Sequence, residues 1–336
     1  MKGHEYRFAI REACGALLPT LAVLICIAAG LKLMVITGLM PAVASVNNAG
    51  TTILAHQASA ARSHYPGEVV LLGDSTCLVG VDAASLSREL PGQPPALNLS
   101  LFIWLALKDY GEVLADFASA NPGQVRTVVL LLTPEKLGAD IRPTEEELWH
   151  NVRREVQGLS TPIVPSATLR GRLGFGGLRE NLLSHVLATP LRGKGPGVAF
   201  YGFCSGVDAY MTAHDGSYLE FGSLARPRKI PQRKWAFVAD LEAESRAFRS
   251  RVPPGAKFFA GLTPIAESYC SPDERVQRLD MLHRWNRWIQ ADALLTNLPP
   301  SLPDVLFAGQ GHLNEAGQKR FTSALARQLS QLMDSR

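Results

Sequence analysis

The sequence of 336 residues lacks the patterns that mark several common classes of site. Its five cysteines include no CxxC pair, which argues against a structural zinc site. It has no glycine-rich phosphate loop and no internal repeat. The net charge is only +4, and no basic stripe is interleaved with aromatic residues, so composition does not favour binding to nucleic acid. We expect no metal ion, no cofactor and no nucleic-acid partner.

An apolar run near the N-terminus is the clearest physical signal in the chain. It covers residues 13–40, and Lys32 is the only charged residue in it. A membrane-spanning helix needs roughly 20 apolar residues, so the run is long enough for an anchor. Three basic residues precede it, which predicts a cytoplasmic tail over residues 1–12 and a body outside the inner membrane. A cleaved signal peptide is the alternative, with Ala42-Val43-Ala44 as the cleavage site.

An extracytoplasmic compartment would permit disulfide bonds. Cys204 and Cys270 could form a pair there, and two separate buried thiols are the alternative. Cys14 and Cys26 belong to the predicted anchor, and we expect Cys77 to be packed rather than reactive.

Strand and helix patterns alternate along most of the remaining chain. Residues 41–66 are mostly small and polar and predict a linker or a loosely held helix, and residues 67–336 predict one globular domain. Apolar runs predict strands at residues 69–72, 96–100, 125–132, 257–262 and 304–307. Helices are expected between them, at about residues 76–90, 104–120, 236–248 and 271–295, and from residue 315 onward. This alternation predicts an α/β fold with a doubly wound parallel sheet.

The alternation stops between about residues 139 and 234, which are rich in glycine, proline and arginine. Helices are expected there over residues 144–156, behind a capping box of Thr144 and Glu147, and over residues 178–187. We interpret the region as an insertion that forms either a cap over the site or a partner-binding lobe. Its basic cluster could contact acidic sugars or lipid headgroups, or could be a solvated loop: Arg226, Arg228, Lys229, Arg233 and Lys234.

A serine and a histidine fall on loops that follow expected strands. Ser75 comes after Gly73-Asp74 at the end of the first strand, and His312 follows the last one. The carboxyl ends of parallel strands meet at one edge of a sheet, so these side chains can lie together. Histidine is the usual base that activates a serine nucleophile. The alternatives are that Ser75 caps a helix and that His312 packs or caps.

These two motifs resemble those of the SGNH/GDSL hydrolase superfamily. The segments are Gly73-Asp74-Ser75 and the run Gly311-His312-Leu313-Asn314-Glu315-Ala316-Gly317, and the resemblance covers about residues 67–136 and 255–332. The second run is similar to membrane-anchored members of the alginate O-acetyltransferase and D-alanine transfer groups. The resemblance implies a flavodoxin-like three-layer fold without metal or cofactor. It also implies a serine esterase or O-acyltransferase that uses Ser75 and His312 on acyl, especially acetyl, groups of a cell-surface polysaccharide, in some cases beside a membrane-bound O-acyltransferase.

The sequence departs from the superfamily pattern at the supporting residues. The superfamily usually has an aspartate three residues before the histidine, where this chain has Gly309, so Asp304 and Glu315 are the local substitutes. Asp74 is expected to support its own turn. The usual asparagine after the third strand and the usual glycine after the second are also missing. Oxyanion donors are therefore sought at the Ser75 N–H and at three further residues: Gly80, Asn98 and Ser100. These losses favour the alternative function, a non-catalytic glycan-binding or scaffold subunit of a polysaccharide acylation or export complex.

Overall fold

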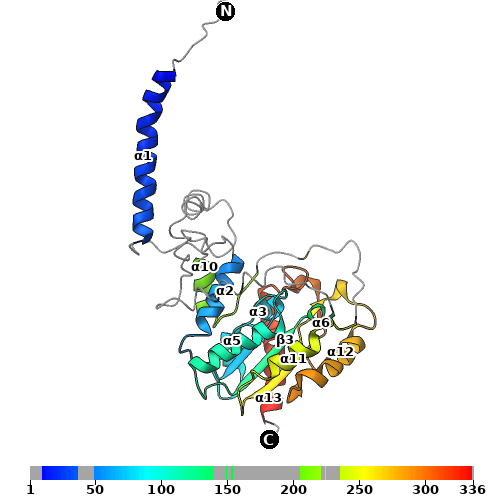
Figure 1. Ribbon diagram of the computed structural model, residues 1–336. Coiled ribbons are helices and arrows are strands. Elements are labelled where there is room, and N and C mark those ends of the chain that lie inside the picture. Colours follow the sequence, from blue (N-terminus) through cyan, green and yellow to red (C-terminus); the bar gives the residue numbers. More distant parts are fainter. Residues whose placement is uncertain are drawn as a thin grey trace, which may run out of the picture.

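The computed structural model describes residues 10–36, 49–138, 205–220 and 235–334, together with Trp149, Arg153 and Leu224. The helices expected over residues 144–156 and 178–187, the basic cluster at residues 226–234 and Cys204 fall outside these residues, apart from Trp149 and Arg153. Helix α1 (Ile10–Ile36) extends away from the globular body (Figure 1). Within the part of the chain that the structure describes, no helix combines the length and the apolarity that a membrane crossing requires. The anchor predicted over residues 13–40 is therefore not found there.

The centre of the molecule is a parallel sheet of five strands. They are β1 (Val69–Gly73), β2 (Ala96–Asn98), β3 (Thr127–Leu132), β4 (Lys257–Leu262) and β6 (Ala293–Leu294). Their order is β2-β1-β3-β4-β6, and every neighbouring pair is parallel. This confirms the predicted α/β fold with a parallel sheet. The direction of winding reverses between β1 and β3, and ligands commonly bind at such a reversal in open α/β sheets.

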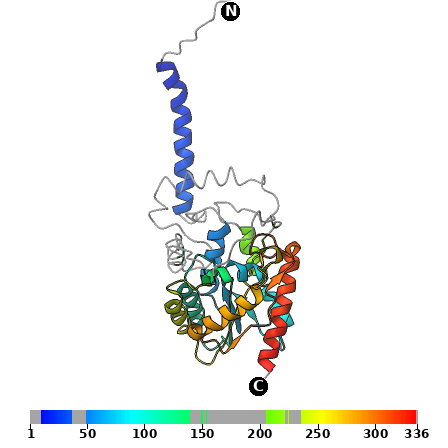
Figure 2. The ribbon, with the colours of Figure 1, turned by 90° about the vertical axis from the view of Figure 1, so that its right-hand side faces the viewer.

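Successive strand residues point to opposite sides of the sheet, so an uninterrupted apolar strand gives the sheet two apolar faces. Helices cover both of them. Val70 and Leu72 of β1 pack in one apolar cluster with α5 (Leu107–Ala120), α11 (Leu241–Arg249) and α12 (Glu274–Ile289). Val69 and Leu71 pack in a second cluster with α4 (Ala83–Glu89) and α13 (Glu315–Asp334). In Figure 2, α13 (red) runs along one side of the body. The result is three layers.

The structure differs from the predicted linker at its second half. Residues 49–60 form α2 (Ala49–Ala60), which lies beside α10 (Ser205–Ala213) near the β2 edge of the sheet (Figure 1). Leu54 is fully buried in the same cluster as Val70. The Gln57 side-chain amide donates to the carbonyls of Ser100 at 3.0 Å and Gly216 at 3.2 Å. The small residues that suggested a linker instead allow this helix to pack closely, so the globular body begins by residue 49.

In the C-terminal half, the helix predicted over residues 271–295 is shorter in the structure, and a strand follows it. Helix α12 ends at Ile289, not near residue 295, because Gln290 adopts a left-handed conformation with φ of 50°. The fifth strand, β6, occupies the end of the predicted helix. Asp292 fixes it to β4, since its backbone N–H donates to the Phe258 carbonyl at 2.8 Å and its carboxylate accepts from the Phe258 N–H at 2.7 Å. Neither glycine nor proline marks this helix end, so no stop signal was present from which to predict it.

The strand predicted at residues 304–307 is instead a 3₁₀ turn, η3 (Asp304–Leu306). A separate pair of parallel strands, β5 (Ile265–Ala266) and β7 (Ser301–Leu302), precedes it. Two other predicted helices begin or divide differently. The helix expected from residue 236 begins at Leu241, and the one expected over residues 76–90 is two helices, α3 (Ser75–Gly80) and α4.

Candidate active site

Ser75 is the first residue of α3, directly after the end of β1. The residue that caps this helix is Asp74, whose carboxylate accepts from the Thr76 N–H at 2.9 Å. The structure therefore does not place Ser75 in the N-cap role that was the alternative. The first N–H groups of a helix have no acceptor within the helix, so the Ser75 N–H is oriented toward the space at the end of the sheet.

Gly73 permits this turn because β1 and β3 approach each other closely there. A Cβ atom added at Gly73 would lie 1.9 Å from the Leu131 carbonyl oxygen and 2.8 Å from the Cys77 Cβ. No side chain fits without moving one of the two strands. The absence of a side chain at Gly73 therefore determines where the Ser75 hydroxyl lies.

We expect Gly73→Ala to destabilise the protein by at least about 3 kcal/mol, since it forces backbone apart in a packed core. Denaturant unfolding would measure the loss. Gly80→Ala, in the same short helix, is the matched control because its added Cβ would meet Phe321 at 3.6 Å and Leu313 at 3.7 Å, which are ordinary contact distances. Equal stability of the two variants would contradict the close approach at Gly73.

Asp74 holds the ends of β1 and β3 together. Its second carboxylate oxygen accepts from the Thr133 N–H at 2.8 Å, and Thr76 donates to the first through both its N–H and its hydroxyl. The side chain is fully buried, and this burial raises the pKa of Asp74 while the bonds from Thr76 and Thr133 oppose the rise. Asp74 thus positions the nucleophile rather than reacting.

His312 is presented by a tight loop between η3 and α13. A bridge between Phe307 and Leu313 closes the loop, and the Ala308 N–H donates to the His312 carbonyl at 2.8 Å. Asn314 caps α13, since its side-chain oxygen accepts from the Gly317 N–H at 3.1 Å. The His312 Nε2 lies 2.9 Å from the Ser75 Oγ. The structure therefore brings together the two residues that the sequence predicted as nucleophile and base.

The acid that completes the site is Glu220, which the sequence did not indicate. The other ring nitrogen of His312, Nδ1, hydrogen-bonds the Glu220 carboxylate. This bond lowers the pKa of Glu220, and burial opposes the shift. A Cβ atom added at Gly309 would lie 3.7 Å from Glu220 Oε1. The carboxylate that is absent at Gly309 is thus replaced in space by one from a distant segment.

Backbone and side-chain bonds hold the Glu220 segment against α3, α4 and α13. The Tyr218 N–H donates to the Leu78 carbonyl at 3.1 Å, and the Ala83 N–H donates to the Ser217 hydroxyl at 2.9 Å. The Gln318 side-chain amide donates to the Tyr218 carbonyl at 3.0 Å. These contacts place the end of the inserted region at the site. The aperiodic sequence around residue 220 carries no signal that would have selected this glutamate among 30 acidic residues.

Three other residues that the sequence suggested for the site make their hydrogen bonds elsewhere: Asn98, Ser100 and Asp304. The Asn98 side-chain amide donates to the carbonyls of Cys77 at 3.3 Å and Val81 at 3.2 Å, and its oxygen accepts from the Ser100 N–H at 3.0 Å. These bonds use the amide of Asn98 and the N–H of Ser100 to stabilise α3 and the loop after β2. Asp304 accepts from the Ser268 N–H at 2.9 Å and, within the described chain, makes no hydrogen bond with His312.

Gly80 lies at the far end of α3, where it faces Leu313 and Phe321 of the second apolar cluster. The Ser75 N–H is therefore the oxyanion donor that the described residues leave best placed. A single donor is a weak oxyanion hole, because removal of one donor elsewhere costs about 10²–10³ in rate.

The cysteines near the site take no part in its chemistry. Cys77 is buried, and this burial raises its pKa to about 12, so the thiol stays neutral. The Cys270 Sγ lies 3.7 Å from the Ala266 carbonyl oxygen. Its pairing with Cys204 stays a prediction, since Cys204 is outside the described residues. Among the residues that are described, no cluster of three or more His, Cys, Asp or Glu could hold a metal ion.

One ring nitrogen of His312 contacts the Ser75 hydroxyl, and the other contacts the Glu220 carboxylate. This is the arrangement that a nucleophile, a base and an orienting acid require. The acid can hold the imidazole in one tautomer and stabilise its protonated form during proton transfer. Comparison of the chain with protein-family models, with curated proteins and with solved structures gives no match. The chemical assignment consequently rests on the geometry of these three side chains.

Proposed function

We propose that the protein is a serine esterase or O-acyltransferase of the SGNH/GDSL kind, acting on acyl groups, in particular acetyl groups, of a cell-surface polysaccharide. The observation that carries the proposal is the 2.9 Å contact between Ser75 Oγ and His312 Nε2, with Glu220 on the opposite ring nitrogen. The motifs Gly73-Asp74-Ser75 and Gly311-His312 support the choice of superfamily. The Glu220 carboxylate removes one departure from its pattern, since it occupies the space beside Gly309.

The reaction proceeds through an acyl-enzyme. Ser75 Oγ attacks the ester carbonyl while His312 Nε2 takes the hydroxyl proton, and Glu220 stabilises the imidazolium. The tetrahedral intermediate then collapses, the ester C–O bond breaks, and His312 returns the proton to the leaving sugar alkoxide. Water or a second sugar hydroxyl next gives its proton to His312 and attacks the acyl carbon, which releases Ser75. Water gives hydrolysis, and a sugar hydroxyl gives transfer.

A non-catalytic glycan-binding or scaffold role is the second candidate. The engagement of Asn98 and Ser100 in structural bonds favours it, because it leaves few donors for an oxyanion. The two candidates differ in whether Ser75 is nucleophilic. A catalytic serine reacts with an activated phosphonate, whereas a serine that serves only as the first residue of a helix does not.

The test is labelling of the full-length protein with a fluorophosphonate probe, together with p-nitrophenyl acetate hydrolysis. We expect stoichiometric labelling that Ser75→Ala abolishes. Ser85→Ala is the matched control, since Ser85 lies on the neighbouring helix α4 and contacts Asp82 rather than His312. Absence of labelling, or equal labelling of the Ser75→Ala variant, would favour the non-catalytic role.

We also propose that the domain acts outside the cytoplasmic membrane, held there by its N-terminal segment, beside a membrane-bound O-acyltransferase where the reaction is transfer. The charge pattern of residues 1–40 supports this location. So does α1, in which seven apolar side chains are more than half exposed: Leu17, Leu18, Leu21, Val23, Leu24, Ile25 and Ile27. A phosphatase reporter fused after Arg336 should be active only if the C-terminus is exported. Activity of a cytoplasmic reporter at the same position would contradict the location.

A further inference from the structure

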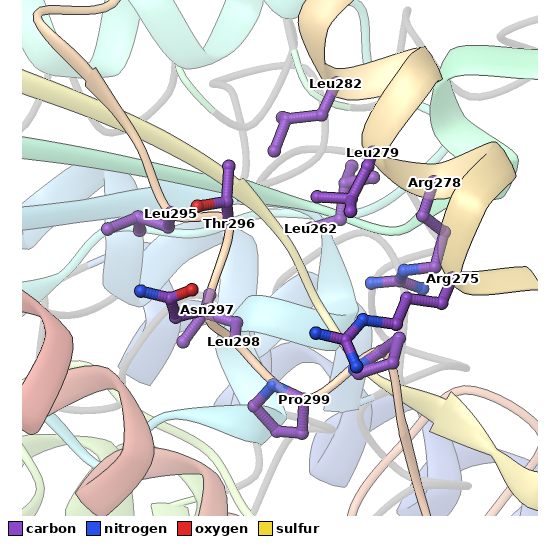
Figure 3. Close-up of a pocket in the computed structure, with 11 residues that line it drawn as sticks. Leu262, Arg275, Arg278, Leu279, Leu282, Leu295, Thr296, Asn297, Leu298 and Pro299 are labelled. Carbon is purple, nitrogen blue, oxygen red and sulfur yellow. The ribbon is translucent and has the colours of Figure 1, made fainter.

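A cavity lies over the ends of β4 and β6, and none of the residues that line it belongs to the candidate active site. Its volume is about 260 Å³. Helix α12 forms one side, and the loop after β6 forms the other (Figure 3). The described residues that line it include two arginines and no carboxylate. The cavity is therefore positively charged on one side, and nothing in the proposed reaction uses it.

The two arginines come from successive turns of α12. Figure 3 shows Arg275 and Arg278 on the same side of the cavity, across from the loop that carries Thr296 and Asn297. Arg278 is only 5% exposed, and its guanidinium donates to the Thr263 carbonyl at 2.6 Å, which fixes its position. Arg275 is exposed, and no hydrogen bond or ion pair to it occurs within the described chain. Its planar fork is free to bind a carboxylate in a bidentate manner.

Apart from the two arginines and the polar side chains of Thr296 and Asn297, the lining is aliphatic. Leu262, Leu279 and Leu282 line the α12 side, and Leu295 and Leu298 line the loop side (Figure 3). Hydrated groups such as sugar hydroxyls would lose water against these side chains, whereas methylene groups gain from burial there. A doubly charged phosphate would lose more hydration than a carboxylate. The lining thus matches a ligand with one carboxylate and an aliphatic body.

The size of the cavity limits that body. Liquid water occupies about 30 Å³ per molecule, so the cavity has the volume of roughly eight or nine waters. A short alkyl chain fits in this volume, and because the cavity is open to solvent on one side, the remainder of a longer chain would stay in water and gain nothing from burial.

The cavity is also connected to the nucleophile. The Thr263 hydroxyl, one residue beyond β4, hydrogen-bonds the Thr76 hydroxyl at 2.7 Å, and Thr76 follows Ser75. Arg278 holds the carbonyl of this same Thr263. A ligand beside Arg278 would therefore be linked to Ser75 through two hydrogen-bonded threonines, Thr263 and Thr76.

We propose that this cavity is a binding site for a short-chain aliphatic monocarboxylate. The carboxylate binds Arg275, and the alkyl chain lies against the leucines of α12 and the facing loop. The site does not depend on the proposed reaction, because none of its residues belongs to the Ser75, His312 and Glu220 group.

The test is calorimetric titration of the full-length Ser75→Ala protein with octanoate, hexanoate and octanol. Octanoate should bind at one saturable site, and hexanoate, with two fewer methylenes, about fifteenfold more weakly, since each buried methylene contributes about fourfold. Octanol should bind at least about tenfold more weakly than octanoate because it lacks the charge. Use of the Ser75→Ala protein makes the result independent of esterase activity, so failure here and failure of the proposed function are separate outcomes.

Two arginine variants make the test specific. Arg275→Gln should weaken octanoate binding about tenfold or more and leave octanol binding unchanged. Arg287→Gln is the matched control, since Arg287 is an exposed residue of the same helix that does not line the cavity. Absence of saturable octanoate binding, equal binding of octanol, or equal effects of the two substitutions would overturn the proposal.

Discussion

Replacement of Glu220 by glutamine should lower kcat/KM for p-nitrophenyl acetate by about 10⁴, the size of loss seen when the orienting acid of a serine–histidine site is removed. Glutamine keeps the size of the side chain but presents an amide that cannot stabilise the imidazolium. Steady-state kinetics would measure the loss. Asp304→Asn and Glu315→Gln are the controls, because each removes a carboxylate close to His312 in sequence. A similar loss in all three variants would contradict a specific role for Glu220.

The pH dependence gives a second readout of the same substitution. Because the contact with His312 lowers the pKa of Glu220, its carboxylate stays charged in weakly acidic solution. Its favourable pairing is lost only when the pH falls through that lowered pKa. We therefore expect the Glu220→Gln profile of kcat/KM to extend to lower pH than the unsubstituted profile, since the imidazolium has lost its partner. An unchanged acidic limb would indicate that Glu220 does not pair with the base during catalysis.

A carboxylate restored at Gly309 should recover part of the activity of Glu220→Ala. The backbone at Gly309 has no φ that disfavours a side chain, and the nearest atom to an added Cβ is Glu220 Oε1 at 3.7 Å. We expect the double variant Glu220→Ala/Gly309→Asp to be about tenfold or more faster than Glu220→Ala alone. The isosteric Glu220→Ala/Gly309→Asn variant, which lacks the charge, is the control. Equal rates of the two double variants would show that the Gly309 loop cannot hold an acid against the ring.

Substitution of His312 by alanine should lower kcat/KM by about 10⁴ or more, because Ser75 loses its only base within hydrogen-bonding distance in the described chain. The side chain is partly exposed, so its removal leaves a space that imidazole from solution can enter. We expect added imidazole to restore part of the rate in a saturable manner. The Ser75→Ala/His312→Ala variant corrects for hydrolysis by imidazole itself. Equal imidazole stimulation of the single and double variants would contradict the assignment of His312 as base.

The sequence predicted the parts of the fold that are local and strongly apolar. The buried runs that became β1, β3 and β4 are long enough to be identified without any partner, and the place of Ser75 follows from the first of them. His312 does contact Ser75, although the strand expected before it is the 3₁₀ turn η3. Strand β6 has only two residues and carries no such pattern. For the residues of α2 the sequence left a linker and a loosely held helix open, because alanine, serine and threonine are common to linkers and to closely packed helices.

Glu220 could not be predicted for a different reason. A histidine needs an acid only in space, and 92 residues separate Glu220 from His312 along the chain. The missing aspartate at Gly309 indicated that some acid was lacking but gave no direction in which to search. Asn98 is the opposite case, because the sequence suggested it for an oxyanion hole. In the structure its side-chain N–H groups already donate to three carbonyls, and its side-chain oxygen accepts from a neighbouring N–H.

The origin of Glu220 in the inserted region has a consequence for the order of folding. Ser75 and His312 are 237 residues apart, and both belong to the α/β body, whereas Glu220 must arrive from a segment between β3 and β4. Closure of long loops is entropically unfavourable and slows the formation of distant contacts. We therefore expect the sheet to form before the complete site does. A nascent or partly unfolded chain would hold its nucleophile without a properly oriented base, and hence would be chemically silent until the whole domain is assembled.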